Sequence, residues 1–233
     1  MVSALIFDVD GTLAETEEAH RRAFNETFAS RGIDWDWSQE DYRELLKATG
    51  GKERMARHRD EVGFGPSDGE IADLHKLKTA RYVEIIASGE VPLRPGVAEL
   101  IEAARMAGLP LAIATTTNRP NVDALIRATM NAEPGSIFEA IAAGDEVKAK
   151  KPAPDVFALA LSRLDLPAEA CIAFEDSEMG LKSAQGAGLR VVLTPSAYTD
   201  GGDFSSADWI IPDLSHPLPS EIRQGLGQSA AIS

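Results

Sequence analysis

The stretch Ala4-Leu5-Ile6-Phe7-Asp8-Val9-Asp10-Gly11-Thr12 is a short apolar run that ends in two aspartates. Its first four residues predict a strand that is buried on both faces, as in a parallel sheet covered by helices. Ligands bind at the carboxyl ends of such strands. Asp8 and Asp10 would project from the same side of that end, where their charges repel unless a cation such as Mg2+ lies between them. An isolated pair of this kind can also be a turn with two solvated aspartates, so the rest of the chain decides between the two interpretations.

Five further apolar runs have the length of buried strands: Leu111–Ala114, Ile141–Ala143, Ala170–Phe174, Val191–Leu193 and Trp209–Ile211. Amphipathic segments of helical length alternate with them: Val97–Ala107, Asn121–Met130, Pro154–Leu164 and Met179–Ala187. The alternation from about residue 93 onward predicts an α/β fold with a Rossmann-like, doubly wound parallel sheet. The tail after Ser220 is weakly patterned, and we expect it to be frayed.

Residues 16–92 interrupt this alternation with four helical segments: Glu17–Arg31, Glu40–Ala48, Lys52–Val62 and Ile71–Ser88. The sequence therefore predicts two domains, an α/β core formed by residues 1–15 and 93–233 and an inserted helical domain formed by residues 16–92. Two short connectors at one edge of a core suit a hinged lid. Trp35 and Trp37 alternate with aspartates between two of these helices, and we expect them to pack inside the helical domain.

The composition limits the class of ligand. The 233-residue chain carries a net charge of −14, which argues against nucleic acid and against an anionic membrane, since basic residues bind both. A small phosphorylated ligand needs only local cations. Residues 43–59 hold six basic residues and two acidic ones, and they either face a cleft or form a solvated helix face.

The cellular setting is inferred from what the sequence lacks. It has no run of 18 apolar residues and no recognisable signal segment, so we expect a cytoplasmic protein. We also expect a monomer. The single cysteine, Cys171, is expected to pack in the core.

Three further polar motifs each follow a predicted strand: Glu175-Asp176, Thr115-Thr116-Thr117-Asn118 and Lys150-Lys151-Pro152. The acidic pair could share a metal ion with the first two aspartates. The hydroxyl motif could cradle a phosphate or cap a helix, and the lysine motif could neutralise a phosphoryl oxygen or be solvated. Together they supply a carboxylate nucleophile, a second carboxylate as acid/base, metal ligands, a hydroxyl and an ammonium group. That set suits phosphoryl transfer through a covalent aspartyl phosphate.

On these four motifs the chain resembles the haloacid dehalogenase (HAD) superfamily, in members that carry an α-helical cap after the first motif. The resemblance covers residues 8 to about 208. It implies four catalytic residues: Asp8 as nucleophile, Asp10 as general acid/base, and Thr115 and Lys151 as the groups that hold the phosphoryl oxygens. It implies four residues at an Mg2+ site: Asp8, Asp10 through its backbone carbonyl, Asp176, and Glu175 in or beside that set. The dehalogenases of the superfamily lack the second aspartate, so Asp10 favours phosphate chemistry.

Among capped members, the chain is similar to the CbbY-type sugar bisphosphate phosphatases and to the β-phosphoglucomutases. The CbbY type removes the 1-phosphate of xylulose 1,5-bisphosphate, a misfire product that inhibits Rubisco of the Calvin cycle, and leaves xylulose 5-phosphate. The resemblance implies a small phosphosugar as the ligand. It implies these substrate contacts: Asp8, Glu17, His20, Gly50, Gly51, Lys52, Glu53, Arg54, His75, Lys76, Leu77, Lys78, Thr115, Thr116, Thr117, Asn118, Arg119, Pro120 and Asn121.

Alternatives to these roles remain open at the level of sequence. A mutase would use the same residues to return the phosphoryl group to another hydroxyl, and a phosphosugar-binding regulator would keep the site without turnover. His20 could be a half-buried structural histidine, or it could bridge the cap and the core near the acid/base. Arg54 and Lys78 could instead lie on solvated helix faces.

Overall fold

The structure, a computed structural model, describes residues 2–228 and contains one parallel sheet of six strands within that range. The strands lie in the order β3-β2-β1-β4-β5-β6. Their bounds are Ala4–Phe7 for β1, Leu111–Ala114 for β2, Ala140–Ala142 for β3, Cys171–Glu175 for β4, Arg190–Leu193 for β5 and Trp209–Ile210 for β6. The order runs outward in both directions from β1, so the switch point between β1 and β4 is where a ligand crevice is expected in an open α/β sheet.

The register brings the carboxyl ends of the central strands to one edge of the sheet. Phe7, the last residue of β1, pairs with Ile113 of β2 and with Phe174 of β4. The rings of Phe7 and Phe174 stack with their centroids 4.6 Å apart. The polar residues that follow these strands are therefore neighbours in space.

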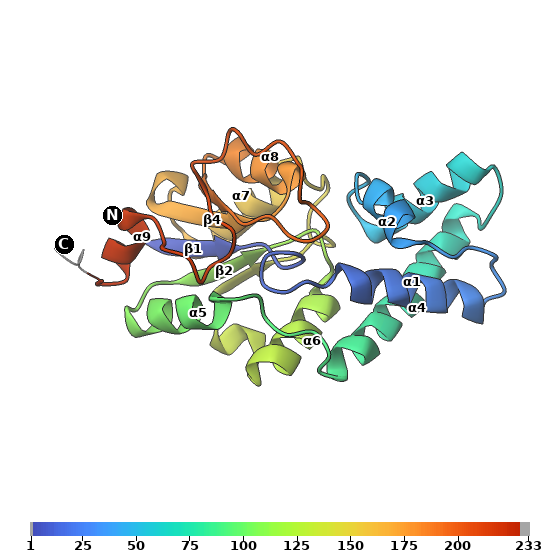
Figure 1. The fold of residues 1–233 in the computed structure, drawn as a ribbon, viewed down its shortest axis with the longest axis horizontal. Coiled ribbons are helices and arrows are strands. Elements are labelled where there is room, and N and C mark those ends of the chain that lie inside the picture. The colour runs from blue at the N-terminus through green and yellow to red at the C-terminus, as the bar shows by residue number, and fades with distance from the viewer. Residues whose placement is uncertain (1, 229–233) are drawn as a thin grey trace.

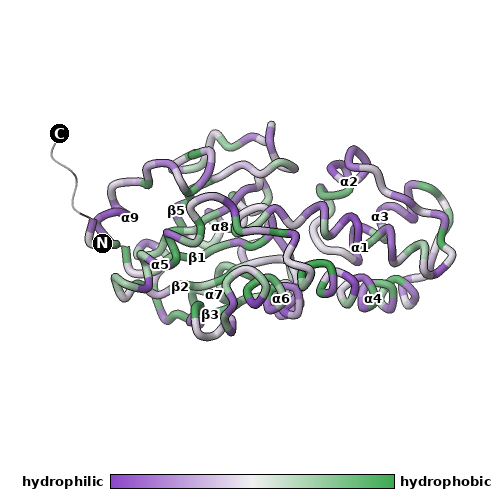
Figure 2. Tube along the Cα trace, turned by 60° about the horizontal axis from the view of Figure 1, so that its bottom comes forward, coloured by the Kyte–Doolittle hydropathy of each residue, from purple (hydrophilic) through white to green (hydrophobic). Residues whose placement is uncertain are grey.

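Helices cover both faces of this sheet, because alternate strand residues point to opposite sides. Leu5 and Phe7 of β1 face a core shared with α5 (Val97–Met106) and α6 (Arg119–Met130). Ala4 and Ile6 face a second core shared with α7 (Asp155–Leu164) and α8 (Glu178–Gly186). Figure 2 shows the hydrophobic trace concentrated along the strands and the hydrophilic trace on the outer turns of the helices.

Four helices lie between β1 and α5 and form a separate block beside the sheet (Figure 1). They are α1 (Glu17–Ser30), α2 (Gln39–Leu45), α3 (Gly51–Val62) and α4 (Asp68–Ala87), and we call residues 16–92 the helical block. The block has a core of its own, centred on Phe24, Phe28, Trp35, Trp37 and Tyr42, so the predicted packing of the two tryptophans is confirmed.

The two connectors of the helical block lie side by side. Ala14 and Leu93 form an isolated antiparallel bridge, and the Arg94 N–H donates a hydrogen bond of 2.8 Å to the Leu13 carbonyl. Both chain crossings thus occur at one place, which leaves the block free to rotate about that place if its other contacts break.

The prediction of a frayed tail is wrong for the described residues up to 228. A helix, α9, runs from Ser220 to Gly225. Ile222 and Leu226 stand one helical turn apart and are buried in the same core as α5. Two apolar residues at that spacing suffice to dock a short helix, although they make a weak sequence pattern. Two short 3-10 turns, Pro134–Ser136 and Ala168–Ala170, complete the regular structure of the described residues. No helix of the described part of the chain is both long and apolar enough to cross a membrane.

Candidate active site

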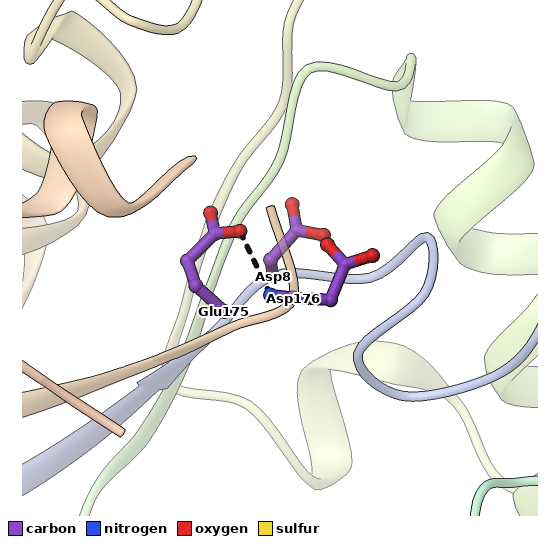
Figure 3. Close-up of side chains that lie close together, drawn as sticks. All are labelled: Asp8, Glu175 and Asp176. Carbon is purple, nitrogen blue, oxygen red and sulfur yellow. Dashed lines mark hydrogen bonds between the residues drawn. The ribbon is translucent and has the colours of Figure 1, made fainter. Parts of the chain in front are cut away.

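The site lies where four strands end. Asp8 directly follows β1 and Thr115 directly follows β2. Lys151 lies on the loop between β3 and α7, Glu175 is the last residue of β4, and Asp176 comes next. Figure 3 shows Asp8, Glu175 and Asp176 gathered at this edge, with the Asp176 N–H donating to a Glu175 carboxylate oxygen at 3.2 Å. The structure thus assembles residues that are up to 168 positions apart in the sequence, from Asp8 to Asp176.

Lys151 connects two of these carboxylates. Its Nζ lies 2.5 Å from Asp8 Oδ1 and 2.5 Å from Glu175 Oε1, and all three side chains are buried. Burial by itself would lower the pKa of Lys151, but the attraction of the two carboxylates outweighs it and raises the pKa. Lys151 is therefore a permanent ammonium group next to the Asp8 carboxylate.

Lys151 pairs with Asp8 and Glu175, but within the described residues no cation pairs with Asp176. Asp8, Glu175 and Asp176 each offer an oxygen within 4.8 Å of the others. Burial, together with Glu175 and Asp10, raises the pKa of Asp8 to about 8 despite Lys151. Burial, together with Glu175 and Asp8, raises the pKa of Asp176 well above its usual value. Three buried carboxylates with converging oxygens, of which Asp8 and Asp176 have raised pKa values, form a site that fits a hard divalent cation.

Gly11 allows the close approach of one of these carboxylates. A Cβ at this position would lie 2.1 Å from Asp176 Oδ2, and the backbone φ of +81° also disfavours other residues. The glycine in the first motif is therefore required by the acidic cluster itself.

Asp10 lies in a different environment from Asp8. It accepts a hydrogen bond of 2.6 Å from the Thr16 hydroxyl, and His20 Nε2 lies 3.1 Å from the same Oδ1. Burial alone would raise the pKa of Asp10, but His20, Thr16 and Lys78 outweigh it and hold the pKa at about 2. The surroundings of these two carboxylates thus shift their pKa values in opposite directions, upward for Asp8 and downward for Asp10.

The helical block supplies the groups behind Asp10. Lys78 of α4 lies with its Nζ 2.6 Å from His20 Nδ1, and the His20 ring stacks on Tyr82 with centroids 4.0 Å apart. Lys78 is 4% exposed, so the solvated alternative for this residue is wrong. Burial, with help from Arg54, lowers the pKa of Lys78 to about 7.

Arg54 of α3 is also buried. Its Nη1 donates a hydrogen bond of 2.6 Å to the Tyr42 hydroxyl, and its guanidinium lies 4.8 Å from the centre of the Tyr42 ring. Nearby, burial raises the pKa of Glu17 to about 7, although Arg54 lowers it. The solvated alternative for Arg54 is therefore wrong as well.

A cavity of about 480 Å3 separates the helical block from the strand ends. Most of the predicted contact residues line it: Asp8, Asp10, Glu17, His20, Gly50, Gly51, Lys52, Glu53, Arg54, His75, Lys78, Thr116, Thr117, Asn118, Asn121, Lys151 and Asp176. Thr115 and Glu175 are buried and are not among the residues that line the cavity. Lys76, Leu77, Arg119 and Pro120 are exposed residues that do not line the cavity.

The structure also adds residues to the cavity wall that sequence reasoning missed: Leu46, Thr49, Gly144, Asp145, Val147, Lys148, Lys150, Ser177, Met179 and Thr199. A signal existed for Lys150, which belongs to the lysine motif already recognised, and for Lys148, which lies two residues before it. No local pattern marked Thr199, whose place follows from the course of the chain after β5.

A buried carboxylate, a buried lysine and a hydroxyl thus stand together at the strand ends of an open parallel sheet. The family model of haloacid dehalogenase-like hydrolases matches residues 2–188. The chain belongs to this family, and it is a phosphatase.

Named relatives resemble it along nearly the whole chain. Protein CbbY of Rhodobacter capsulatus is 72% identical over 214 residues, which cover 92% of this chain and 94% of that protein. A crystal structure of CbbY from Rhodobacter sphaeroides in complex with phosphate superposes with a TM-score of 0.90 and 53% identity, covering 93% of this chain and 96% of that one. A mutant of the same protein in complex with xylulose-(1,5)bisphosphate gives the same values.

Proposed function

We propose that the protein is an Mg2+-dependent sugar bisphosphate phosphatase that removes the 1-phosphate of xylulose 1,5-bisphosphate and leaves xylulose 5-phosphate. A protein 53% identical to this chain was crystallised with that bisphosphate, which supports this choice of sugar. The charges in the cavity support a ligand with two phosphates.

The observation that carries the proposal is the distribution of unpaired cations. Within the described residues, eight of the 23 Lys and Arg side chains have no carboxylate oxygen within 4.0 Å: Arg31, Arg43, Lys52, Arg54, Lys78, Lys148, Lys150 and Arg223. Five of the eight line the cavity: Lys52, Arg54, Lys78, Lys148 and Lys150. The chain has 37 acidic residues, more than enough to form an ion pair with each of these cations. The five cations that line the cavity nevertheless have no carboxylate partner, which indicates that a polyanionic ligand balances their charge.

Three of the cavity cations act on His75, which also lines the cavity. Burial, then Lys78, Lys52 and Lys150, lower the pKa of His75 to about 3. These lysines come from α3, α4 and the loop after β3, so both sides of the cavity contribute. Each phosphate monoester carries about −1.5 to −2 charges at pH 7. We place the phosphate that does not react among these lysines and Arg54, whose charge acts on Lys78, and the reacting phosphate at Asp8.

At the reacting end, each residue has a role in the transfer. The Asp8 carboxylate attacks phosphorus and the bond from phosphorus to the sugar oxygen breaks. Asp10 gives that oxygen a proton, which requires Asp10 to be protonated in the complex with substrate. Water then attacks the aspartyl phosphate, loses a proton to Asp10, and releases inorganic phosphate and free Asp8. Lys151 and Thr115 hold the phosphoryl oxygens during both steps. Asp8, Asp176 and the Asp10 carbonyl, with Glu175 in or beside that set, would hold Mg2+, which would supply positive charge that favours ionised Asp8 and offsets the negative charge on the phosphoryl group.

We propose further that the helical block is a cap domain that opens and closes over the core of residues 1–15 and 93–233. Its adjacent connectors support this motion. Contacts across the cavity, such as the 2.7 Å hydrogen bond from the Thr49 hydroxyl to the Lys151 carbonyl, would hold the closed form. Closure would exclude bulk water from the reacting phosphate.

The test is the release of inorganic phosphate by the purified protein with Mg2+. We expect rapid release of one phosphate from xylulose 1,5-bisphosphate and slow release from β-glucose 1-phosphate. Consumption of β-glucose 1-phosphate without free phosphate would instead identify a mutase. Tight binding of the bisphosphate with no turnover at all would identify a regulator.

A further inference from the structure

The segment Ser196–Thr199, which follows β5, contacts the acidic cluster on one side and the helical block on the other. We call it the docking segment. None of its residues was singled out by the sequence motifs, and the mechanism above does not use them.

On the side of the cluster, Thr199 holds Asp176. The Thr199 Oγ1 lies 2.7 Å from the Asp176 carbonyl oxygen and 3.2 Å from its carboxylate Oδ2. The Ser196 N–H donates to Thr199 Oγ1 at 2.9 Å, and the two hydroxyl oxygens lie 3.0 Å apart. Since Gly11 also approaches this carboxylate closely, Asp176 contacts both the first motif and the docking segment.

On the side of the block, Tyr198 joins the packed aromatic residues of the helices. Its ring meets that of Tyr42 edge to face, with centroids 5.9 Å apart, and lies 5.3 Å from the Arg43 guanidinium. Its hydroxyl donates to the Glu18 carboxylate, and Arg43 Nη2 donates a hydrogen bond of 3.0 Å to the Ala197 carbonyl. Tyr198 belongs to the core by sequence but packs against the apolar cluster of the helical block.

From these contacts we propose that Tyr198 and Thr199 are positioning residues that couple docking of the helical block to the orientation of Asp176. Tyr198 is fixed only while α1 and α2 are docked, and Thr199 is its neighbour in the chain. When the block moves away, Tyr198 loses its partners in α1 and α2, while Thr199 keeps its hydrogen bonds to Ser196 and Asp176. Asp176 is therefore held less firmly in the open form than in the closed form. The coupling rests on the proposed metal-dependent function of this cluster.

The first test measures Mg2+ binding directly, by calorimetry on protein stripped of metal with EDTA. Residues that orient a metal ligand typically change affinity by about 10- to 100-fold when mutated. We expect Thr199→Val to raise the Kd for Mg2+ by about 10-fold or more. Thr199→Ser, which keeps the hydroxyl, should bind as the wild type does. The matched control is Thr129→Val in α6, because the Thr129 hydroxyl donates only to the Leu125 carbonyl.

The second test concerns the coupling. Tyr198 does not contact the acidic cluster, yet Tyr198→Ala should also raise the Kd for Mg2+, whereas Tyr198→Phe, which keeps the ring, should raise it less. In the double variant Tyr198→Ala, Thr199→Val, the loss of Mg2+ binding free energy should be smaller than the sum of the losses in the two single variants. The reason is that both substitutions remove the same constraint on Asp176. Normal Mg2+ affinity in Tyr198→Ala, or additive effects, would overturn the coupling.

Failure of the two proposals can be told apart. If the wild type binds Mg2+ but releases no phosphate from any sugar phosphate, the proposed function fails, whatever the docking segment does. If the wild type is an active phosphatase while Thr199→Val and Tyr198→Ala both keep their Mg2+ affinity, only the role of the docking segment fails. Circular dichroism melts of each variant identify any that do not fold, and Thr199→Ser and Tyr198→Phe then supply the comparison.

Discussion

His20 Nε2 lies 3.1 Å from Asp10 Oδ1, although His20 belongs to the helical block and Asp10 to the sheet. Lys78 approaches the other ring nitrogen, Nδ1, at 2.6 Å. An ammonium group can only donate, so the ring nitrogen next to Lys78 accepts and Nε2 carries the proton that it donates to Asp10. Burial, with Lys78, lowers the pKa of His20 to about 4, and the ring therefore stays neutral at pH 7. The block thus sets the protonation of Asp10 through one neutral histidine.

Replacing His20 should change the titration of Asp10. In His20→Phe the ring can still stack on Tyr82, but the hydrogen bond that lowers the pKa of Asp10 is gone. Burial then dominates and the pKa of Asp10 rises from about 2. We expect the acidic limb of the pH profile of kcat, measured with p-nitrophenyl phosphate, to move to higher pH. An acidic limb that is unchanged would show that His20 does not act on Asp10.

Lys78→Met should stabilise the protein in a pH-dependent way. The pKa of Lys78 is lowered from 10.5 to about 7 by burial, so the charged form is disfavoured in the folded state. Burying the charged lysine lowers the free energy of unfolding. This loss is fully present below pH 7, where Lys78 is charged in both the folded and the unfolded protein, and it vanishes as the pH rises to 10.5, the pKa of Lys78 in the unfolded chain. Urea melts should therefore show a gain in unfolding free energy at pH 6 that shrinks by pH 10.

The same Lys78→Met variant should bind the bisphosphate less well, because it loses one cavity cation. Lys182→Met, on an exposed helix face where Lys182 pairs with Glu178 at 2.5 Å, is the matched control for both measurements. Equal stability gains at pH 6 and pH 10 would contradict the assignment of a buried, strained ammonium group.

Asp8→Asn should abolish turnover and leave the fold intact. The amide has nearly the same volume as the carboxylate but cannot attack phosphorus, and loss of a nucleophile typically lowers kcat by about 10³-fold or more. Phosphate release and far-ultraviolet circular dichroism check the two parts. Asp73→Asn, on the exposed face of α4, should keep wild-type kcat. Turnover near the wild-type rate in Asp8→Asn would contradict the covalent mechanism.

Arg54→Ala and Lys150→Ala should separate the two phosphates of the substrate. Each loses one charge-assisted hydrogen bond, worth about 1.5–3 kcal/mol, to the phosphate that does not react. We expect KM for xylulose 1,5-bisphosphate to rise by about 10-fold or more in each variant. KM for p-nitrophenyl phosphate, which has only the reacting phosphate, should change much less. An equal rise in KM for both substrates would show that Arg54 and Lys150 do not bind the phosphate that does not react.

Metal removal should make stability depend on pH. The pKa of Asp8 is raised from 3.8 to about 8 in the folded state, so the folded protein holds more protons than the unfolded chain between those values. Stability of the metal-free protein therefore falls as pH rises from about 4 to 8. Mg2+ binds the ionised carboxylates and should raise Tm more at pH 8 than at pH 5. An equal rise at both pH values, measured against EDTA-treated protein, would contradict this linkage.

Local patterns were sufficient for most elements of the fold. Short apolar runs bounded by polar residues predict the strands to within one residue, because a strand covered on both faces needs apolar side chains at every position. Helix starts were less well placed. Helix α4 begins at Asp68, three residues earlier than predicted, because Ser67 and Glu70 form a reciprocal cap. Helix α9 was missed because two apolar residues make too little pattern.

Within the site, the sequence by itself determined the chemistry at the strand ends. In a parallel sheet, residues that follow the carboxyl ends of neighbouring strands must meet, so Asp8, Thr115, Lys151 and Asp176 were predictable from their positions after apolar runs. Only the tertiary structure decided which other side chains enter the cavity and what charge each carries there. Three features depend on how the helical block docks: the hydrogen bond between His20 and Asp10, the burial of Lys78, and the packing of Tyr198 against the block. No local pattern encodes that docking, because it is set by packing between segments far apart in the chain, and burial there shifts each pKa.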